Sequence, residues 1–241
     1  EVLIQNCSIK DVSHTGIKIT GQEKNIQFVR LLKNRISETG GPGIQMSNAR
    51  FVYVANNEVI RSGSSNDSRK WGRGSGLWTW SASDILIEKN KFMYANGPGD
   101  SAGAHIDYNC DNVILQYNFS AHNAGGFCEV LGNNYNCAYR YNISVNDGNR
   151  VKGKDGAFQE GKTFWLSGYQ GNKERKGPVN TYIYNNTIFV NKDISAKIAI
   201  DNSSEGILIA NNIFYFQGES SMVMGDQYKP DTSAGGQINR V

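Results

Sequence analysis

The sequence predicts an all-β fold, a right-handed parallel β-helix, in which short strands stack into a solenoid. The first observation is a repeat of alternating apolar residues, an Asn, an apolar residue and a Gly-containing turn along nearly all 241 residues. The second is the period of two inside each unit, which is typical of strands with one buried side. The third is the absence of any sustained helical period with caps. Stacked coils of strands explain all three.

The repeat units supply a register for the coils. They are VLIQNCSI (2–9), RLLKNRI (30–36), FVYVANNEV (51–59), DILIEKNKF (84–92), NVILQYNF (112–119), AYRYNI (138–143), YIYNNTI (182–188) and ILIANNIF (207–214). An apolar anchor after each Asn gives the equivalent positions Ile9, Ile36, Val59, Phe92, Phe119, Ile143, Ile188 and Ile213. The spacing indicates coils of about 22–27 residues with two longer loop insertions. We expect the recurring Asn to form a side-chain ladder along the stack.

This pattern resembles the right-handed parallel β-helix proteins of the pectin-lyase-like superfamily, over nearly the whole chain. The resemblance implies a carbohydrate-active protein of bacterial polysaccharide breakdown, secreted or periplasmic. The same scaffold carries lyases, hydrolases, epimerases, esterases and adhesins, so the fold leaves the chemistry open. The repeat begins at residue 2, whereas a solenoid needs polar end caps. We therefore expect residues 1–241 to be a single β-helix domain from a longer chain, without at least its N-terminal cap.

Composition argues against several kinds of partner. The formal net charge is +3 and no long block of one sign occurs, so a nucleic-acid partner is not expected. No apolar run approaches the roughly 20 residues that cross a bilayer, and residues 1–20 do not show the basic-then-apolar pattern of a secretory signal. The four cysteines (Cys7, Cys110, Cys128 and Cys137) lack paired spacings, which predicts free, buried thiols. We expect a monomer that binds a polysaccharide or oligosaccharide.

Counting back fourteen residues from four anchors defines a column on a second strand of each coil. The column contains Gln45, Trp78, His105 and Glu129, and a second column two residues later contains Ser47, Trp80, Asp107 and Leu131. Small or apolar residues flank each member of the first column, so both columns are expected to face solvent. Neighbouring coils lie about 4.8 Å apart and alternate residues about 6.6 Å apart, which brings His105, Asp107 and Glu129 into one patch.

Two insertions are expected to wall a groove around this patch. Residues 61–76 supply Arg69, Lys70, Trp71 and Arg73, and the segment after Ile143 supplies Arg150, Lys152, Lys154, Asp155, Glu160, Lys162 and Trp165. Lys162 and Trp165 should lie beside the coil of Glu129. Asp100 precedes the strand of His105, and we expect it either to fold over the patch or to cap a turn. The predicted substrate-binding residues are Trp78, Trp80, Gln45, Arg150, Lys152, Lys162 and Trp165.

Two carboxyl groups near a saccharide favour a glycoside hydrolase, in which one is the acid and the other the nucleophile or base. Asp107 and Glu129 are offset by one coil and two residues, a Cα separation of about 8 Å. His105 would orient a carboxylate or bind a sugar hydroxyl, and Asp100 is a further catalytic candidate. The nearby basic residues would suit an acidic or sulfated sugar. No metal or other cofactor is expected for this chemistry.

Two alternatives remain open. A polysaccharide lyase or C5-epimerase would use His105, Lys152 or Lys162 as base, and Ca²⁺ held by Asp100 or Asp107 could neutralise a uronate. The alginate epimerases of this superfamily carry Asp-Pro-His-Asp, whereas this chain reads DSAGAHID, without the Pro-His pair. The other alternative is a non-catalytic carbohydrate-binding or adhesin solenoid that uses its tryptophans alone.

Overall fold

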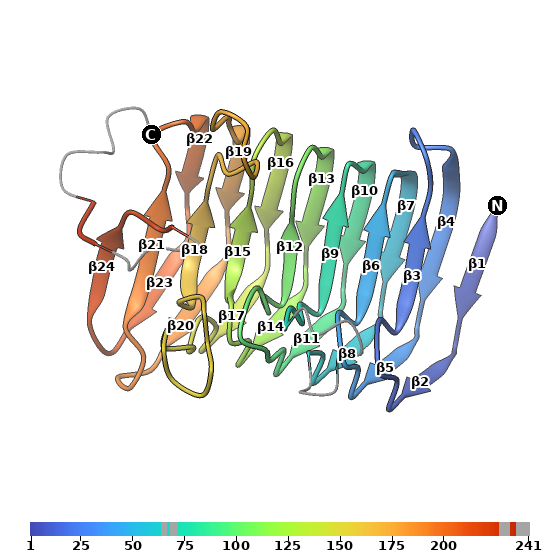
Figure 1. The fold of residues 1–241 in the computed structure, drawn as a ribbon, viewed down its shortest axis with the longest axis horizontal. Coiled ribbons are helices and arrows are strands. Elements are labelled where there is room, and N and C mark those ends of the chain that lie inside the picture. The colour runs from blue at the N-terminus through green and yellow to red at the C-terminus, as the bar shows by residue number, and fades with distance from the viewer. Residues whose placement is uncertain (64–66, 68–71, 227–231, 235–241) are drawn as a thin grey trace.

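A computed structural model describes residues 1–63, 67, 72–226 and 232–234. Over these residues the chain winds into three parallel sheets of eight strands, and Figure 1 shows the coils stacked side by side along the long axis. Each complete coil contributes one strand to each sheet. The predicted parallel β-helix is confirmed. Among the described residues no helix is both long enough and apolar enough to cross a membrane.

The strands fall into the three sheets in chain order. The first sheet holds Val2–Gln5 (β1), Ile26–Leu32 (β4), Ala49–Ala55 (β7), Ser83–Glu88 (β10), Asp111–Gln116 (β13), Tyr135–Arg140 (β16), Val179–Tyr184 (β19) and Glu205–Ala210 (β22). The second holds Ser8–Lys10 (β2), Arg35–Ser37 (β5), Glu58–Ile60 (β8), Lys91–Met93 (β11), Phe119–Ala121 (β14), Ile143–Val145 (β17), Thr187–Val190 (β20) and Ile213–Phe216 (β23). The third holds Ile17–Thr20 (β3), Ile44–Ser47 (β6), Leu77–Trp80 (β9), Ala104–Ile106 (β12), Gly126–Val130 (β15), Lys162–Leu166 (β18), Ala196–Ile200 (β21) and Ser220–Val223 (β24).

The predicted asparagine ladder lies at the corner between the first and second sheets. Its members are Asn34, Asn57, Asn90, Asn118, Asn142, Asn186 and Asn212. At every step the Oδ1 atom of one Asn accepts hydrogen bonds of 2.9–3.0 Å from the backbone N–H and the side-chain amide one coil earlier. An amide both donates and accepts, so one residue type can continue the ladder through the stack. The ladder is confirmed.

Three of the predicted anchors are wrong by one residue. The register follows Ile36, Val59 and Phe92 as expected, but Phe92 then pairs with Ser120. The apolar residues directly after the Asn in the later coils, Phe119, Ile143 and Ile213, therefore point outward, and Ile143 is 49% exposed. A shift of one residue reverses the face of a strand. Ser120 faces inward in its place because its hydroxyl accepts a hydrogen bond from the buried Asn123.

The fourteen-residue count nevertheless reached the correct column, because two differences cancel. The turn after β12 contains one residue more than the turn after β9. The extra residue is Asn109, which has a φ of 59°. This extra residue offsets the error in the anchor. Asn133 takes the same place in the next coil, with a φ of 57°.

The cysteines agree with expectation in part. Cys110, Cys128 and Cys137 are free and buried. Cys7 is free but exposed, because it lies in the end coil of the stack.

Replacing Asn90 by Ala should lower the free energy of unfolding by about 3 kcal/mol, because it leaves buried partners unpaired. The lost bonds are those from the backbone and side chain of Asn57 and those to the carbonyl of Val54 and to Asn118. Chemical denaturation measures the change. Asn96→Ala, at an exposed position, is the control and should change stability by less than about 0.5 kcal/mol. Equal effects of the two substitutions would contradict a stabilising ladder.

Candidate active site

The third sheet aligns one residue from each coil into the predicted column. Strand pairing places Gln45 beside Trp78, Trp78 beside His105, and Glu129 beside Trp165. His105 and Glu129 are neighbours because Ile106 pairs with Val130. Residues that flank the column face the core, as expected.

The expectation that this column faces solvent is wrong. His105 is 1% exposed and Glu129 is 3% exposed, and Gln45 and Trp165 are also buried. The column does point away from the core, but loops cover it. The loop before β9 contributes Ser75, whose Oγ lies 2.9 Å from the Nδ1 atom of His105.

The covering loops are joined to one another by polar contacts. Arg73 forms an ion pair with Asp100 at 2.5 Å, and the backbone N–H of Asp100 donates to Gln159. Arg150 donates to the carbonyls of Gly97 at 2.9 Å and Gln159 at 2.8 Å. These contacts tie the loops before β9, β12 and β18 together above the third sheet.

A glycine allows the loop of Asp100 to lie close to the solenoid. A Cβ atom at Gly125 would overlap the carbonyl oxygen of Asp100. Any larger residue at position 125 would therefore displace the loop that carries this carboxylate.

His105 lies among acidic groups. Its Nε2 atom is 3.7 Å from the Oδ2 atom of Asp107, and its ring stacks on Trp78 with centroids 6.2 Å apart. Burial alone would lower the pKa of the imidazole, but the negative charges of Glu129 and Asp107 outweigh it and raise the pKa to about 9. His105 is therefore protonated at neutral pH.

Glu129 is a buried carboxyl with an unused oxygen. Burial, against the opposing positive charge of His105, is the main cause that raises its pKa to about 7, and the negative charges of Asp100 and Asp107 act in the same direction as burial. Among the described residues no group forms a hydrogen bond with its Oε1 atom. A buried carboxyl of this kind is typical of functional sites.

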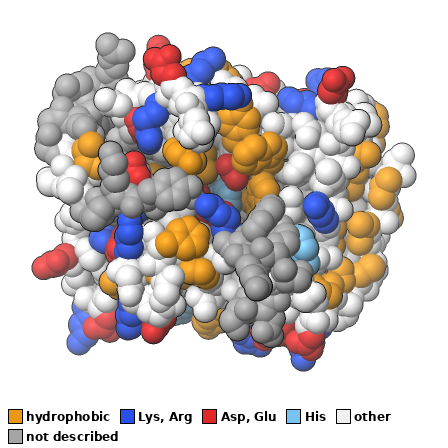
Figure 2. All heavy atoms as spheres, in the orientation of Figure 1, with side chains coloured by type: hydrophobic (Ala, Val, Ile, Leu, Met, Phe, Trp, Pro, Cys, Tyr) orange, Lys and Arg blue, Asp and Glu red, His pale blue; other side chains and the backbone are white. Residues whose placement is uncertain are grey.

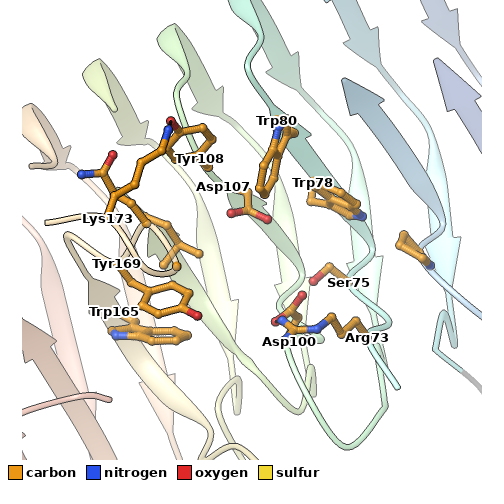
Figure 3. Close-up of a pocket in the computed structure, with 14 residues that line it drawn as sticks. Arg73, Ser75, Trp78, Trp80, Asp100, Asp107, Tyr108, Trp165, Tyr169 and Lys173 are labelled. Carbon is orange, nitrogen blue, oxygen red and sulfur yellow. Dashed lines mark hydrogen bonds and ion pairs between the residues drawn. The ribbon is translucent and has the colours of Figure 1, made fainter. Parts of the chain in front are cut away.

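A pocket of about 570 Å³ lies over this part of the third sheet. Its aromatic lining consists of Trp78, Trp80, Tyr108, Trp165 and Tyr169. Figure 3 shows Asp107 directed into the space between Trp80 and the Asp100–Arg73 pair, with Trp165 and Tyr169 on the other side. In the space-filling view, hydrophobic side chains gather near the middle of the visible face among acidic and basic ones (Figure 2). The pocket thus combines flat apolar surfaces with carboxylates.

The predicted site residues differ in whether they line this pocket. Trp78, Trp80, Asp100, Asp107 and Trp165 line the pocket. His105 and Glu129 belong to the same column but do not line it. Gln45, Arg150, Lys152 and Lys162 do not line it either. Arg69, Lys70 and Trp71 lie outside the described residues.

The side chains outside the pocket have other contacts. Gln45 accepts a hydrogen bond from Thr15 at 3.4 Å. Arg150 is buried and binds the loop carbonyls described above. The ammonium group of Lys162 lies 4.8 Å above the ring of Trp165, so this lysine supports a wall of the pocket. Lys152 is half-buried, and its backbone N–H donates to Glu160 at 2.8 Å.

Sequence reasoning missed several residues that complete the pocket. They are Pro42, Ser75, Tyr108, Tyr169, Gln170, Gly171 and Lys173. Tyr108 directly follows Asp107 in a turn, and its ring lies 5.1 Å from that of Trp80. The others lie in loops without a period, so the sequence contained no signal for their position.

The electrostatics predict an unusual titration of His105. Its ring signals in an NMR titration should report a pKa of about 9, and Glu129→Gln should lower it because a nearby negative charge is removed. The folded pKa is above the ordinary 6.5, so the folded chain keeps a proton that the unfolded chain loses. The free energy of unfolding should therefore decrease as pH rises from about 6.5 to 9. An unchanged pKa in the variant would contradict this coupling.

The chain was compared with known proteins. Residues 1–173 match a family model described as a right-handed beta helix region. No curated protein matches.

Solved structures are similar to this chain to different degrees. A GH136 lacto-N-biosidase from Eubacterium ramulus (selenomethionine derivative) has a TM-score of 0.51 and 19% identity over 78% of this chain and 28% of its own. Its native form has a TM-score of 0.47, with 17% identity over 80% and 28%. An alginate lyase from Paenibacillus sp. str. FPU-7 has a TM-score of 0.46, with 17% identity over 90% of this chain and 74% of its own. The chain thus spans only 28% of the length of the lacto-N-biosidase.

Proposed function

The chain belongs to the right-handed β-helix family, and on this scaffold we propose a glycoside hydrolase that cleaves a polysaccharide or oligosaccharide. The broader proposal is a carbohydrate-active enzyme. A GH136 lacto-N-biosidase shares the fold, which agrees with both. The observation that carries the proposal is a pair of carboxyl groups in different environments, Asp107 in an aromatic pocket and Glu129 buried beside it.

The two carboxyl groups suit two different roles. Glu129, with a pKa of about 7, holds a proton for much of the time near neutral pH and would protonate the leaving-group oxygen. The Asp107 carboxylate faces the pocket and would act as nucleophile or activate water. Their offset of one coil and two residues gives a Cα separation of about 8 Å. The unused Oε1 atom of Glu129 would gain a partner when a saccharide enters.

His105 would position this pair. Its ion pair with Asp107 and its contact with Ser75 fix the imidazole between the two acids. A raised pKa keeps His105 protonated near neutral pH, which makes it a poor base. This state favours hydrolysis over a lyase reaction in which His105 would abstract a proton.

Aromatic stacking would hold the sugar. Five aromatic side chains line the pocket, and flat rings of this kind bind the apolar faces of sugars. The two pocket cations have contacts within the protein. Arg73 is paired with Asp100, and the Lys173 ammonium group lies 3.2 Å from the Tyr108 hydroxyl.

Replacing each carboxyl should stop hydrolysis while saccharide binding remains. We expect Asp107→Asn and Glu129→Gln each to lower kcat by a factor on the order of 10² to 10⁴, since each removes a group needed in the transition state. Reducing-end release from a saccharide panel measures this, with Asp193→Asn, at an exposed position, as the control. An ultraviolet-absorbing unsaturated product would instead indicate a lyase. Binding without any turnover by the parent protein would indicate a lectin-like module.

The pH dependence should identify the acid. Because Glu129 must be protonated to act, kcat/KM should fall about tenfold per pH unit above a pKa of about 7. Glu129→Gln should abolish this decrease and leave a residual rate that is flat across that range. A decrease that persists in the variant would assign the acid to another residue.

A further inference from the structure

A second groove lies on the outer face of the first sheet, whereas the candidate active site lies on the third. It has a volume of about 800 Å³ and crosses β4, β7, β10, β13 and β16, which are neighbours in Figure 1. Its length therefore follows the axis of the solenoid. None of the proposed catalytic residues lines it.

The floor and the walls of this groove differ in chemistry. Tyr53, Leu86 and Ile114 align along the floor in successive coils. Phe28 and Phe51 lie along one side and stack with ring centroids 5.3 Å apart and an interplanar angle of 15°.

Two polar side chains, Gln116 and Arg140, line the other side of the groove. Arg140 donates a hydrogen bond to Gln116 at 2.8 Å and to the Tyr184 hydroxyl at 2.9 Å. Gln116 and Tyr53 each donate a hydrogen bond of 2.7 Å to Glu88. The groove therefore offers stacking surfaces on one side and hydrogen-bonding groups on the other.

The two phenylalanines occupy an unfavourable backbone conformation. Their φ angles are 57° and 54°, in the left-handed region that bulky residues rarely adopt. The equivalent residues in the later coils are Asp84, Asn112, Asn136, Asn180 and Gly206, which are types that tolerate this conformation. Burial does not compensate the phenylalanines, because Phe28 is 56% and Phe51 is 39% exposed. A ligand that stacks on the two rings would compensate for this unfavourable backbone conformation.

The charges around the groove are balanced by contacts within the protein. The guanidinium of Arg50 lies 4.3 Å from the ring centre of Phe51 and forms an ion pair with Asp84 at 2.8 Å. Arg30 lies 3.6 Å from Glu1. This balance fits an uncharged ligand with apolar ring faces and hydroxyl groups.

We infer that this groove is a second saccharide site, which binds a neutral polysaccharide chain along the solenoid axis. The coils repeat about every 4.8 Å, so a groove that crosses several of them can contact successive units of an extended chain. The inference shares its ligand class with the proposed hydrolase but does not require hydrolysis. A site of this kind would hold a polymer while another segment occupies the pocket on the third sheet.

Affinity electrophoresis of the full chain tests the inference. The probes are gels that contain galactomannan or arabinoxylan, which are neutral, and polygalacturonate as the acidic comparison. We expect a neutral gel to retard the parent protein, and the Phe28→Asn/Phe51→Asn variant to bind at least fivefold more weakly. Asn suits the left-handed conformation, so this variant should fold with an unchanged or higher Tm.

Matched variants separate the two sites. Tyr94→Asn removes another exposed aromatic residue with positive φ, which directly follows β11 of the second sheet, and should retain full retardation. Trp80→Ala weakens only the pocket on the third sheet, so its remaining retardation should disappear when the two Phe substitutions are added.

Several results would overturn the inference. They are an unchanged affinity of the Phe28→Asn/Phe51→Asn variant, retardation by polygalacturonate alone, or no retardation in either neutral gel. Retardation that depends on Trp80 but not on the phenylalanines would overturn it and leave the proposed hydrolase standing. Loss of retardation in the Phe28→Asn/Phe51→Asn variant, with no hydrolysis by the parent protein, would support the second saccharide site and contradict the proposed hydrolase.

Discussion

The register between coils is the constraint on which the rest of this structure depends. The functional candidates on the third sheet lie at positions defined by the pairing of one coil with the next, and the asparagine ladder fixes that pairing from inside. Each rung satisfies a backbone N–H of the coil before it, so a slipped coil would leave buried polar groups unpaired. The resulting frame can hold groups that repel one another or resist burial.

The candidate active site uses this rigidity. Glu129 and His105 are both nearly inaccessible to water, and loops joined by Arg73, Asp100 and Arg150 cover them. The loss of water raises the pKa of Glu129, whereas the negative charges of Glu129 and Asp107 raise the pKa of His105. The site thus combines a rigid sheet, which sets the spacing of the acids, with loops that set their environment.

The sequence predicted the sheet better than the loops. Period-two alternation and the recurring Asn determine which residues face the core, so the alignment of Trp78, His105 and Glu129 could be found without a structure. The burial of that column could not be predicted, because the loops that cover it have no period. These loops are placed by contacts such as the ion pair between Arg73 and Asp100. The anchor errors at Phe119 and Ile143 have a related cause. At both, the neighbouring serine, Ser120 or Ser144, faces inward and its hydroxyl bonds to a buried side chain, so apolar character alone assigned the wrong face.

A row of left-handed positions in the first sheet has a consequence for how such a protein can change. Near the start of the strands the same backbone conformation holds Phe28, Asp84, Asn112 and Gly206 in different coils. Side chains in this row lie outside the core, so the solenoid accepts different chemistry there without altering its stacking. Such a row is in effect an independent display column, and new surface specificities could be evolved or engineered one coil at a time.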